Sequence, residues 1–235
     1  MTAPRVIIDT KEDLDALLSQ SIEQGIVDDQ NFSIVRELPN QMWEVSFGNA
    51  EHVSIAMEDS DYADIHRELT EKRSYNAKLI DGGLLQLQYL FEGGRLVKHR
   101  LAFLPSPSLR PFQDDPEEYL RDELYLEIVS RRIVPFPLRF DFDMDAAEDV
   151  AHPACHLTLG DVKGCRIPVS APLTPRWFLE FILRNFYSTN AHDLTATLPS
   201  HRHHFPQTIT LRERGLIHVM VPEGARSGEQ TSAAE

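Results

Sequence analysis

Several patterns that mark large classes of protein are missing from this sequence. Its 235 residues contain no run of about 18 or more apolar side chains, which a helix would need to cross a bilayer. Only two cysteines occur, Cys155 and Cys165, which are too few for a disulfide framework. Residues 1–13 lack the basic stretch and apolar block of a secretory signal. We therefore expect a cytoplasmic protein without membrane contact.

The short motifs of the commonest enzyme classes are also absent. There is no phosphate-binding Gly-rich loop that ends in lysine, no G-x-S-x-G elbow, no H-E-x-x-H helix and no dinucleotide fingerprint. These absences disfavour nucleotide-driven motors, esterases of the common fold and zincins. We accordingly expect no cofactor.

A net positive charge, which would favour nucleic acid, is lacking as well. The chain has 37 acidic and 23 basic residues, a net charge of −14. Residues 1–76 carry 16 acidic and 6 basic side chains, whereas residues 77–111 and 151–222 together carry 12 basic and 6 acidic ones. The second of these basic stretches also holds seven of the ten histidines. The acidic regions favour a protein partner, and the two basic stretches offer a surface on which nucleic acid is the alternative partner.

Hydrophobic periodicity predicts an N-terminal helix. Thr10 is expected to cap it, Leu14, Leu17 and Leu18 to face the core, and Gly25 to end it. Two hairpins should follow, the first between residues 42–47 and 52–57. The second joins residues 84–91 to 95–104 through a Gly93-Gly94 turn, with Gln86 and Gln88 facing solvent and with Lys98 and Arg100 on the face opposite His99.

The second half of the chain combines proline-led elements. A helix is predicted to begin at Asp115, a strand to cover residues 138–143, and a further helix to begin after Thr174. Residues 208–211 and 216–221 are expected to form a final hairpin. The pattern predicts one α+β domain over residues 1–222, with 1–76 as an N-terminal subregion. Its mainly antiparallel sheet should have helices packed on one face and a C-terminal β-hairpin, and residues 223–235 should be a disordered tail.

Candidate site residues concentrate between positions 139 and 166. On the predicted strand, alternation places Arg139, Asp141 and Asp143 on one face. His152, His156 and Arg166 follow within 28 residues of sequence. Two histidines and an arginine can cleave RNA by general acid–base catalysis. One imidazole removes the 2′-hydroxyl proton, another protonates the leaving oxygen, and the arginine stabilises the charge of the phosphorane. The alternatives are that Arg139 neutralises Asp141 on an ordinary polar face, and that the histidines bond to backbone.

Metal binding is a further interpretation of the same residues. Asp141 and Asp143 can share a divalent cation. An Asp141-based calcium loop fails, because Ala146 stands where glycine is needed and His152 where a bidentate acid is needed. Zinc on His152, His156 and the two cysteines fits no established spacing. The sequence leaves the metal open, and residues 201–204, a His-rich tract, are expected to be a solvated loop.

The motif residues resemble a known family. The matching parts are residues 137–143, the unit containing His152, Pro153, His156 and Gly160, and residues 165–168 with 172–175. They are similar to an uncharacterised bacterial family catalogued only as a domain of unknown function, over residues 93–187. This resemblance implies a bacterial, cytoplasmic protein and no particular activity. His152, Pro153 and His156 are also similar to small bacterial toxins of the TumE kind, and this resemblance points toward RNA cleavage or a defence system.

Two functional hypotheses follow. The first is an interaction or assembly subunit of a multi-component system, such as a defence or toxin–antitoxin system, supported by the acidic helices and the absence of diagnostic catalytic motifs. The second is a nuclease-like enzyme that uses His152, His156, Arg166 and Asp141 or Asp143. Convergence of these side chains in one cleft would favour the enzyme.

Overall fold

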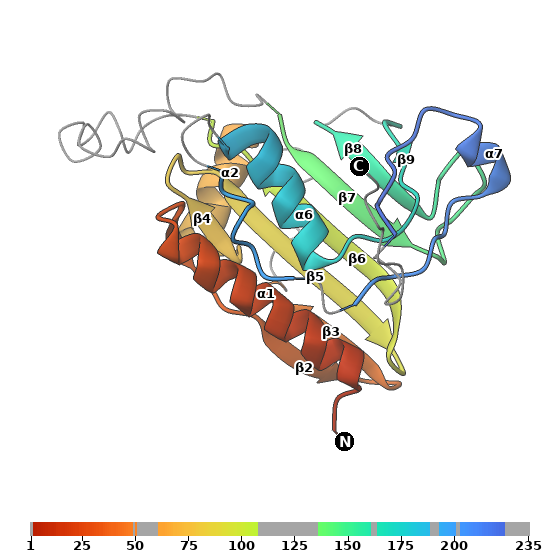
Figure 1. The fold of residues 1–235 in the computed structure, drawn as a ribbon, viewed down its shortest axis with the longest axis horizontal. Coiled ribbons are helices and arrows are strands. Elements are labelled where there is room, and N and C mark those ends of the chain that lie inside the picture. The colour runs from red at the N-terminus through yellow and green to blue at the C-terminus, as the bar shows by residue number, and fades with distance from the viewer. Residues whose placement is uncertain are drawn as a thin grey trace, which may run out of the picture.

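The fold is centred on a single antiparallel sheet. The computed structural model describes residues 2–48, 50, 61–107, 136–160, 164–188, 193–200 and 203–223. Within these ranges the strands are β1 (Val27–Gln30), β2 (Ile34–Leu38), β3 (Met42–Ser46), β4 (Ala77–Leu79), β5 (Leu84–Glu92), β6 (Arg95–Leu104), β7 (Leu138–Asp143), β8 (Cys155–Leu159) and β9 (Ile167–Pro168). Their order is β1-β4-β5-β6-β7-β8-β9, with the β2–β3 hairpin attached through β5 (Figure 1). The predicted α+β class with a mainly antiparallel sheet is confirmed.

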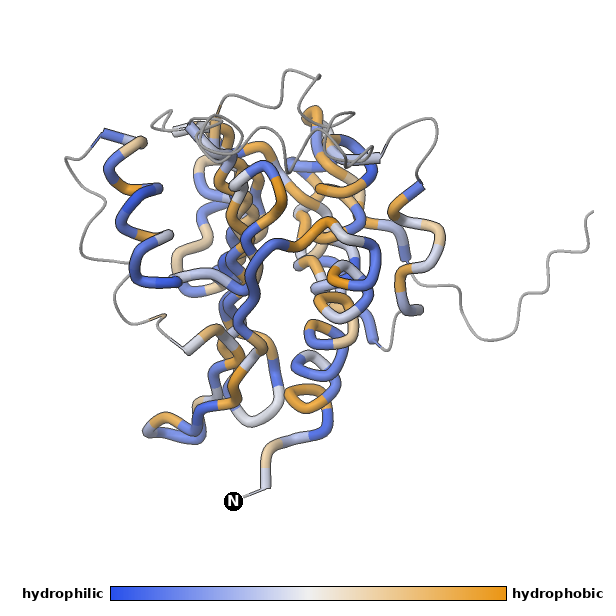
Figure 2. The backbone as a smooth tube through the Cα atoms, turned by 90° about the vertical axis from the view of Figure 1, so that its left-hand side faces the viewer, coloured by the Kyte–Doolittle hydropathy of each residue, from blue (hydrophilic) through white to orange (hydrophobic). Residues whose placement is uncertain are grey.

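Helices cover both faces of this sheet. The helices are α1 (Arg5–Glu23), α2 (Tyr62–Glu71), α6 (Pro175–Ile182), which continues as a π-helical turn, and α7 (Leu211–Arg214). The main core joins α1 and α6 to one face of β5–β8, whereas α2 packs through Leu69 on Leu84, Ala102 and Leu104 of the other face. Figure 2 shows helices on both sides of the sheet. The expectation that all helices pack on one face was wrong, because α2 also has an apolar side to bury.

The N-terminal helix begins earlier than predicted. It starts at Arg5, and Thr10 is buried in its interior, where its hydroxyl donates to the carbonyl of Val6 at 2.8 Å. Burial of Ile7 in the core extends the helix past the predicted cap, so tertiary packing overrides the local signal. The predicted core positions Leu14, Leu17 and Leu18 are buried, and Gly25, with a φ of +73°, follows the last turn.

The central hairpin of β5 and β6 matches the prediction around Gly93-Gly94, where both residues have positive φ. Gln86 does not face solvent, because α2 and its neighbours cover that side and its amide donates to the carbonyl of Ser74 at 2.6 Å. In the first predicted hairpin, β3 pairs with β2 and β5, while residues 52–57 lie outside the described residues. The helix predicted from Asp115 and the tail from position 224 also lie outside them.

The C-terminal region departs most from the prediction. Thr174 caps α6 as expected, and its side chain accepts a hydrogen bond from the amide of Trp177. The predicted final hairpin is wrong, because residues 211–214 form α7. Thr210 and Glu213 make a capping box that satisfies the first amides of this short helix. Val219 forms only an isolated parallel bridge to Val169. Among the described helices, none has the length and apolar character to cross a bilayer.

Candidate functional site

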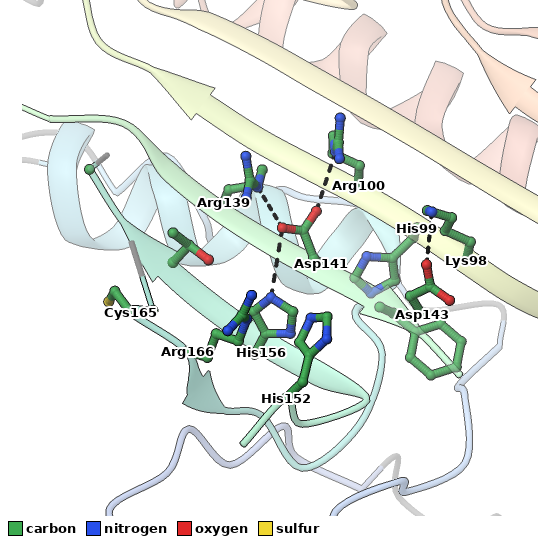
Figure 3. A pocket seen from close by; sticks show the side chains of 14 residues that line it. Lys98, His99, Arg100, Arg139, Asp141, Asp143, His152, His156, Cys165 and Arg166 are labelled. Atoms are coloured by element: carbon green, nitrogen blue, oxygen red, sulfur yellow. Dashed lines mark hydrogen bonds and ion pairs between the residues drawn. The ribbon is translucent and has the colours of Figure 1, made fainter. Parts of the chain in front are cut away.

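A row of polar side chains crosses three neighbouring strands on the sheet face opposite α1 and α6. The register pairs Arg100 of β6 with Asp141 of β7, and Asp141 with His156 of β8. Directly paired residues in a sheet project from the same face, so these three side chains lie side by side. Figure 3 shows Asp141 between the arginines and His156.

All six residues proposed from the sequence line one pocket at this place. It has a volume of about 340 Å³, and Arg139, Asp141, Asp143, His152, His156 and Arg166 all contribute to its wall. Eight further residues complete the wall: Lys98, His99, Arg100, Phe142, Thr158, Gly160, Gly164 and Cys165. The structure therefore brings together side chains from β6, β7, β8 and the loops around β8.

Asp141 forms ion pairs with two arginines of the pocket. Its Oδ2 accepts from Nε of Arg139 at 2.5 Å, and its Oδ1 accepts from Nε of Arg100 at 3.3 Å. The interpretation in which Arg139 neutralises Asp141 is thus confirmed, with Arg100 as a second partner. Both arginines contact Asp141 through Nε, and among the described residues their terminal amino groups make no further hydrogen bond. Terminal guanidinium nitrogens of this kind can donate to an anion.

Asp143 has a different role at the end of the same strand. Lys98 lies 2.8 Å from its Oδ2, while its Oδ1 accepts from the amides of Asp145 and Ala146. Partial burial acts to raise the pKa of Asp143, but the Lys98 ammonium and the two amides outweigh it and lower the pKa. Asp143 therefore stays ionised and shapes the turn that leads toward His152.

His156 is buried with one ring nitrogen turned toward the pocket. Its Nδ1 lies 3.0 Å from the carbonyl of Pro153, and since a carbonyl only accepts, this nitrogen carries the proton of the neutral ring. Its Nε2 then has a free lone pair, 3.9 Å from Oδ2 of Asp141. Burial lowers the pKa of His156. The Pro153 carbonyl and Asp141 act to raise it, but burial, together with smaller effects of His152 and Arg166, outweighs them. The neutral ring is the form that can remove a proton.

His152 faces His156 from the loop after β7. The two ring centroids are 5.0 Å apart, with the planes inclined at 57° (Figure 3). The loop is closed by two backbone hydrogen bonds between Glu148 and His152, at 2.7 and 2.8 Å. His152 lies in the loop before β8 and His156 lies on β8, so the two rings do not share the face of a helix.

The pocket is positively charged in an acidic protein. Four cations line it, Lys98, Arg100, Arg139 and Arg166, against the two carboxylates of Asp141 and Asp143. Within the part of the chain that the structure describes, no carboxylate is paired with Arg166. The site thus carries an excess of two positive charges, whereas the whole chain carries −14. This local balance suits an anionic ligand.

The described part of the structure gives no support for metal binding. Among the described residues, no three His, Cys, Asp or Glu side chains lie close enough together to hold a metal ion. Cys155 points to the opposite face, where its thiol donates to the carbonyl of Ala171. Asp141 and Asp143 share a face as predicted, but each already binds cationic side chains.

Two other histidines are held by contacts outside the row of Arg100, Asp141 and His156, although His99 also borders the pocket. His99 projects into the core face, where its Nε2 accepts from the amide of Leu173 at 3.1 Å and burial lowers its pKa to about 4. Its neighbours Lys98 and Arg100 face the pocket, as the alternation predicts. His203, from the tract expected to be a solvated loop, is instead largely buried against Thr10 and Asp13 of α1.

The sequence reasoning missed Arg100 as a site residue. Its signal was present, because it shares the polar face of β6 with Lys98, but the pairing of β6 with β7 was needed to place it beside Asp141. Thr158 was missed as well, because the pairing of β7 with β8 was needed to place it opposite Arg139.

Comparison with known proteins identifies a family. A family model described as "Uncharacterized conserved protein (DUF2290)" matches residues 26–221, a longer stretch than the resemblance over 93–187 indicated, and it includes every residue of the pocket. No curated protein and no solved structure matches the chain. The likeness to toxins of the TumE kind is therefore not shown.

Proposed function

The chain belongs to the DUF2290 family of uncharacterized conserved proteins, and we propose that its pocket binds the phosphodiester backbone of RNA and cleaves it by general acid–base catalysis. One observation carries the proposal. His156, with an unprotonated Nε2, faces a second imidazole at 5.0 Å between ring centroids, in a pocket lined by three arginines. These are the groups that phosphodiester transfer to a neighbouring hydroxyl requires.

Binding of the phosphate follows from the local charge. Arg166 and the terminal amino groups of Arg100 and Arg139 offer several donors to phosphate oxygens, and a planar guanidinium suits paired contacts of this kind. Asp141 keeps Arg100 and Arg139 side by side and offsets their mutual repulsion. In this role Asp141 is a positioning residue.

The proposed reaction is an internal transfer. Nε2 of His156 removes the proton of the RNA 2′-hydroxyl, and the 2′-oxygen forms a bond to the adjacent phosphorus. The bond from phosphorus to the 5′-oxygen breaks, and the protonated ring of His152 supplies a proton to that oxygen. The products are a 2′,3′-cyclic phosphate and a free 5′-hydroxyl. Exchange of protons with water then restores both imidazoles.

Charge stabilisation falls to the arginines. Negative charge builds up on the phosphorane oxygens in the transition state, and donors already fixed beside it lower the barrier. Arg166, which has no carboxylate partner in the described residues, is the cation best suited to this task. Each imidazole is expected to contribute about 10²- to 10⁴-fold to the rate.

The test compares RNA and DNA of the same sequence, both single-stranded and labelled. The purified protein should cleave the RNA and leave the DNA intact, because only RNA carries the 2′-hydroxyl, and the RNA products should end in a cyclic phosphate. Reactions with a chelator and with Mn²⁺ separate the alternatives. Cleavage of both polymers only with Mn²⁺ would replace the proposal with metal-assisted hydrolysis, and no cleavage under any condition would overturn it.

A second candidate function, an interaction subunit, is favoured by a separate observation. Leu211, Leu216, Ile217 and Met220 are exposed by 87, 46, 94 and 74%, respectively. Exposed apolar residues this close in sequence are typical of surfaces that contact another protein. Loss of cellular function in Ile217→Ser, with function kept in His156→Ala, would favour this role over the enzyme.

A further inference from the structure

The position of the His152 side chain is set by the backbone of its loop and not by hydrogen bonds of its ring. Among the described residues the His152 imidazole makes no hydrogen bond, whereas the His156 ring is bonded to the carbonyl of Pro153. In the described part of the chain, the backbone of His152 is bonded to that of Glu148 alone, across a narrow turn. Whatever fixes residues 148–152 therefore also fixes the distance between the two imidazoles.

The turn is tied to a distant segment of the chain. The amide of Val150 donates to Oε1 of Glu213 at 3.3 Å, and Asp149 accepts from the Thr210 hydroxyl at 2.6 Å and from Arg212 at 3.1 Å. These partners belong to α7 and its cap, more than 60 residues away in sequence. Figure 1 shows α7 at the edge of the fold beyond β8 and β9.

Glu213 is built into this contact. Its side chain is 2% exposed, and its second oxygen accepts from the amide of Thr210 at 2.9 Å, so both carboxylate oxygens have backbone donors. Val150 has a φ of +70°, in the left-handed region that a branched side chain rarely adopts. Such a conformation persists only where its surroundings hold it, and the bond to Glu213 is one such restraint.

We propose that Glu213 is a positioning residue that, through Val150, holds the 148–152 turn so that the His152 ring faces His156. Its catalytic meaning rests on the proposed RNA cleavage, but the positioning itself does not. In this arrangement α7 and its cap connect the C-terminal segment to the turn that carries His152.

The main variant is Glu213→Gln. Glutamine can still accept from one amide, as in other capping boxes, but its NH₂ group then opposes the second amide. The matched control is Arg214→Gln, which removes one charge from the same helix at a residue whose side chain bonds to Gln207 and not to the turn. Should Glu213→Gln fail to fold, Asp149→Ala releases the turn from its partly exposed end.

Two readouts are needed. The first is RNA cleavage, where Glu213→Gln should lower kcat by roughly 10- to 100-fold and leave KM within about twofold, since a misplaced group costs rate and not binding. The second is NMR titration of the His156 ring. Its pKa should rise toward the ordinary value, because the neighbouring His152 contributes to its depression. The control should match the wild type in both.

The outcomes separate the two proposals. If the wild type cleaves no RNA, the proposed function fails, and the His156 titration alone decides the positioning. An unchanged His156 pKa in a folded Glu213→Gln or Asp149→Ala protein would overturn the positioning role, whether or not kcat falls.

Discussion

Asp141 and His156 are directly paired across β7 and β8, and Oδ2 of the carboxylate lies 3.9 Å from Nε2 of the imidazole. The carboxylate is already bonded to Arg139 and Arg100, and the imidazole proton lies on the far nitrogen, Nδ1. This pair is therefore not a donor and acceptor in the resting site. Asp141 acts on His156 through its charge, and the lone pair of Nε2 stays available to a substrate.

Replacement of His156 by alanine should abolish most RNA cleavage. The proposed base is then missing, and kcat should fall by about 10²- to 10⁴-fold while RNA binding persists through the arginines. Initial rates and a separate binding titration measure the two effects. His218→Ala, which removes an imidazole outside the pocket, is the control and should keep wild-type rates. Equal rates in both variants would show that His156 is not the base.

The charge of Asp141 should be visible in the pH dependence of the reaction. Its carboxylate acts to raise the pKa of His156 against the larger effect of burial, which lowers it. Asp141→Asn should therefore lower the His156 pKa further. Because a base must be unprotonated, the acidic limb of kcat/KM should lie below about pH 6.5 in the wild type and lower still in the variant. An upward shift of that limb in Asp141→Asn would contradict this assignment.

The sequence was sufficient to group six residues of the pocket, but it was insufficient to place the neighbouring strands and loops around them. Alternation along residues 138–143 placed Arg139, Asp141 and Asp143 on one face of a strand. His152 and His156 follow that strand closely in sequence, so they were expected to lie near the same face. Such patterns are local and follow from strand geometry. Arg100 could be placed only once the β6–β7 register was known, because no local pattern specifies which strands pair.

Longer-range contacts account for the errors in the prediction. Thr210 and Glu213 have the spacing of a capping box, but residues 208–211 and 216–221 were predicted to form a hairpin. The helix is stabilised by the buried side chain of Glu213, which accepts a hydrogen bond from the amide of Val150, 63 positions earlier in the chain. Similarly, Thr10 was predicted as the cap from local sequence alone. The earlier start of α1 depends on the burial of Ile7 against the sheet, which no local pattern shows.

His99 should make the protein less stable in mild acid. Burial lowers its folded pKa to about 4, whereas the unfolded chain binds the proton near 6.5. The unfolded state thus holds more protons between these values, and the contribution to stability is complete above about pH 6.5 and falls as the pH approaches 4. The full effect is roughly 3 kcal/mol. Urea unfolding at several pH values should show a flatter pH dependence in His99→Gln than in the wild type. Parallel curves would contradict the prediction.

Arg166 should contribute one phosphate contact, which the salt dependence of binding can count. RNA binding should weaken with salt, and the slope of log K against log[salt] changes by about 0.7 for each phosphate neutralised on a single strand. Arg166→Gln should reduce the slope by that amount and weaken binding alike for RNAs of different sequence, because a guanidinium on the backbone reads no base. Arg184→Gln removes the same charge from the π-helical turn after α6, on the sheet face opposite the pocket, and should leave the slope unchanged. The two variants share a net charge, so the comparison isolates the position of the cation. Equal slopes in both would show that RNA is attracted by the overall charge and not held at this pocket.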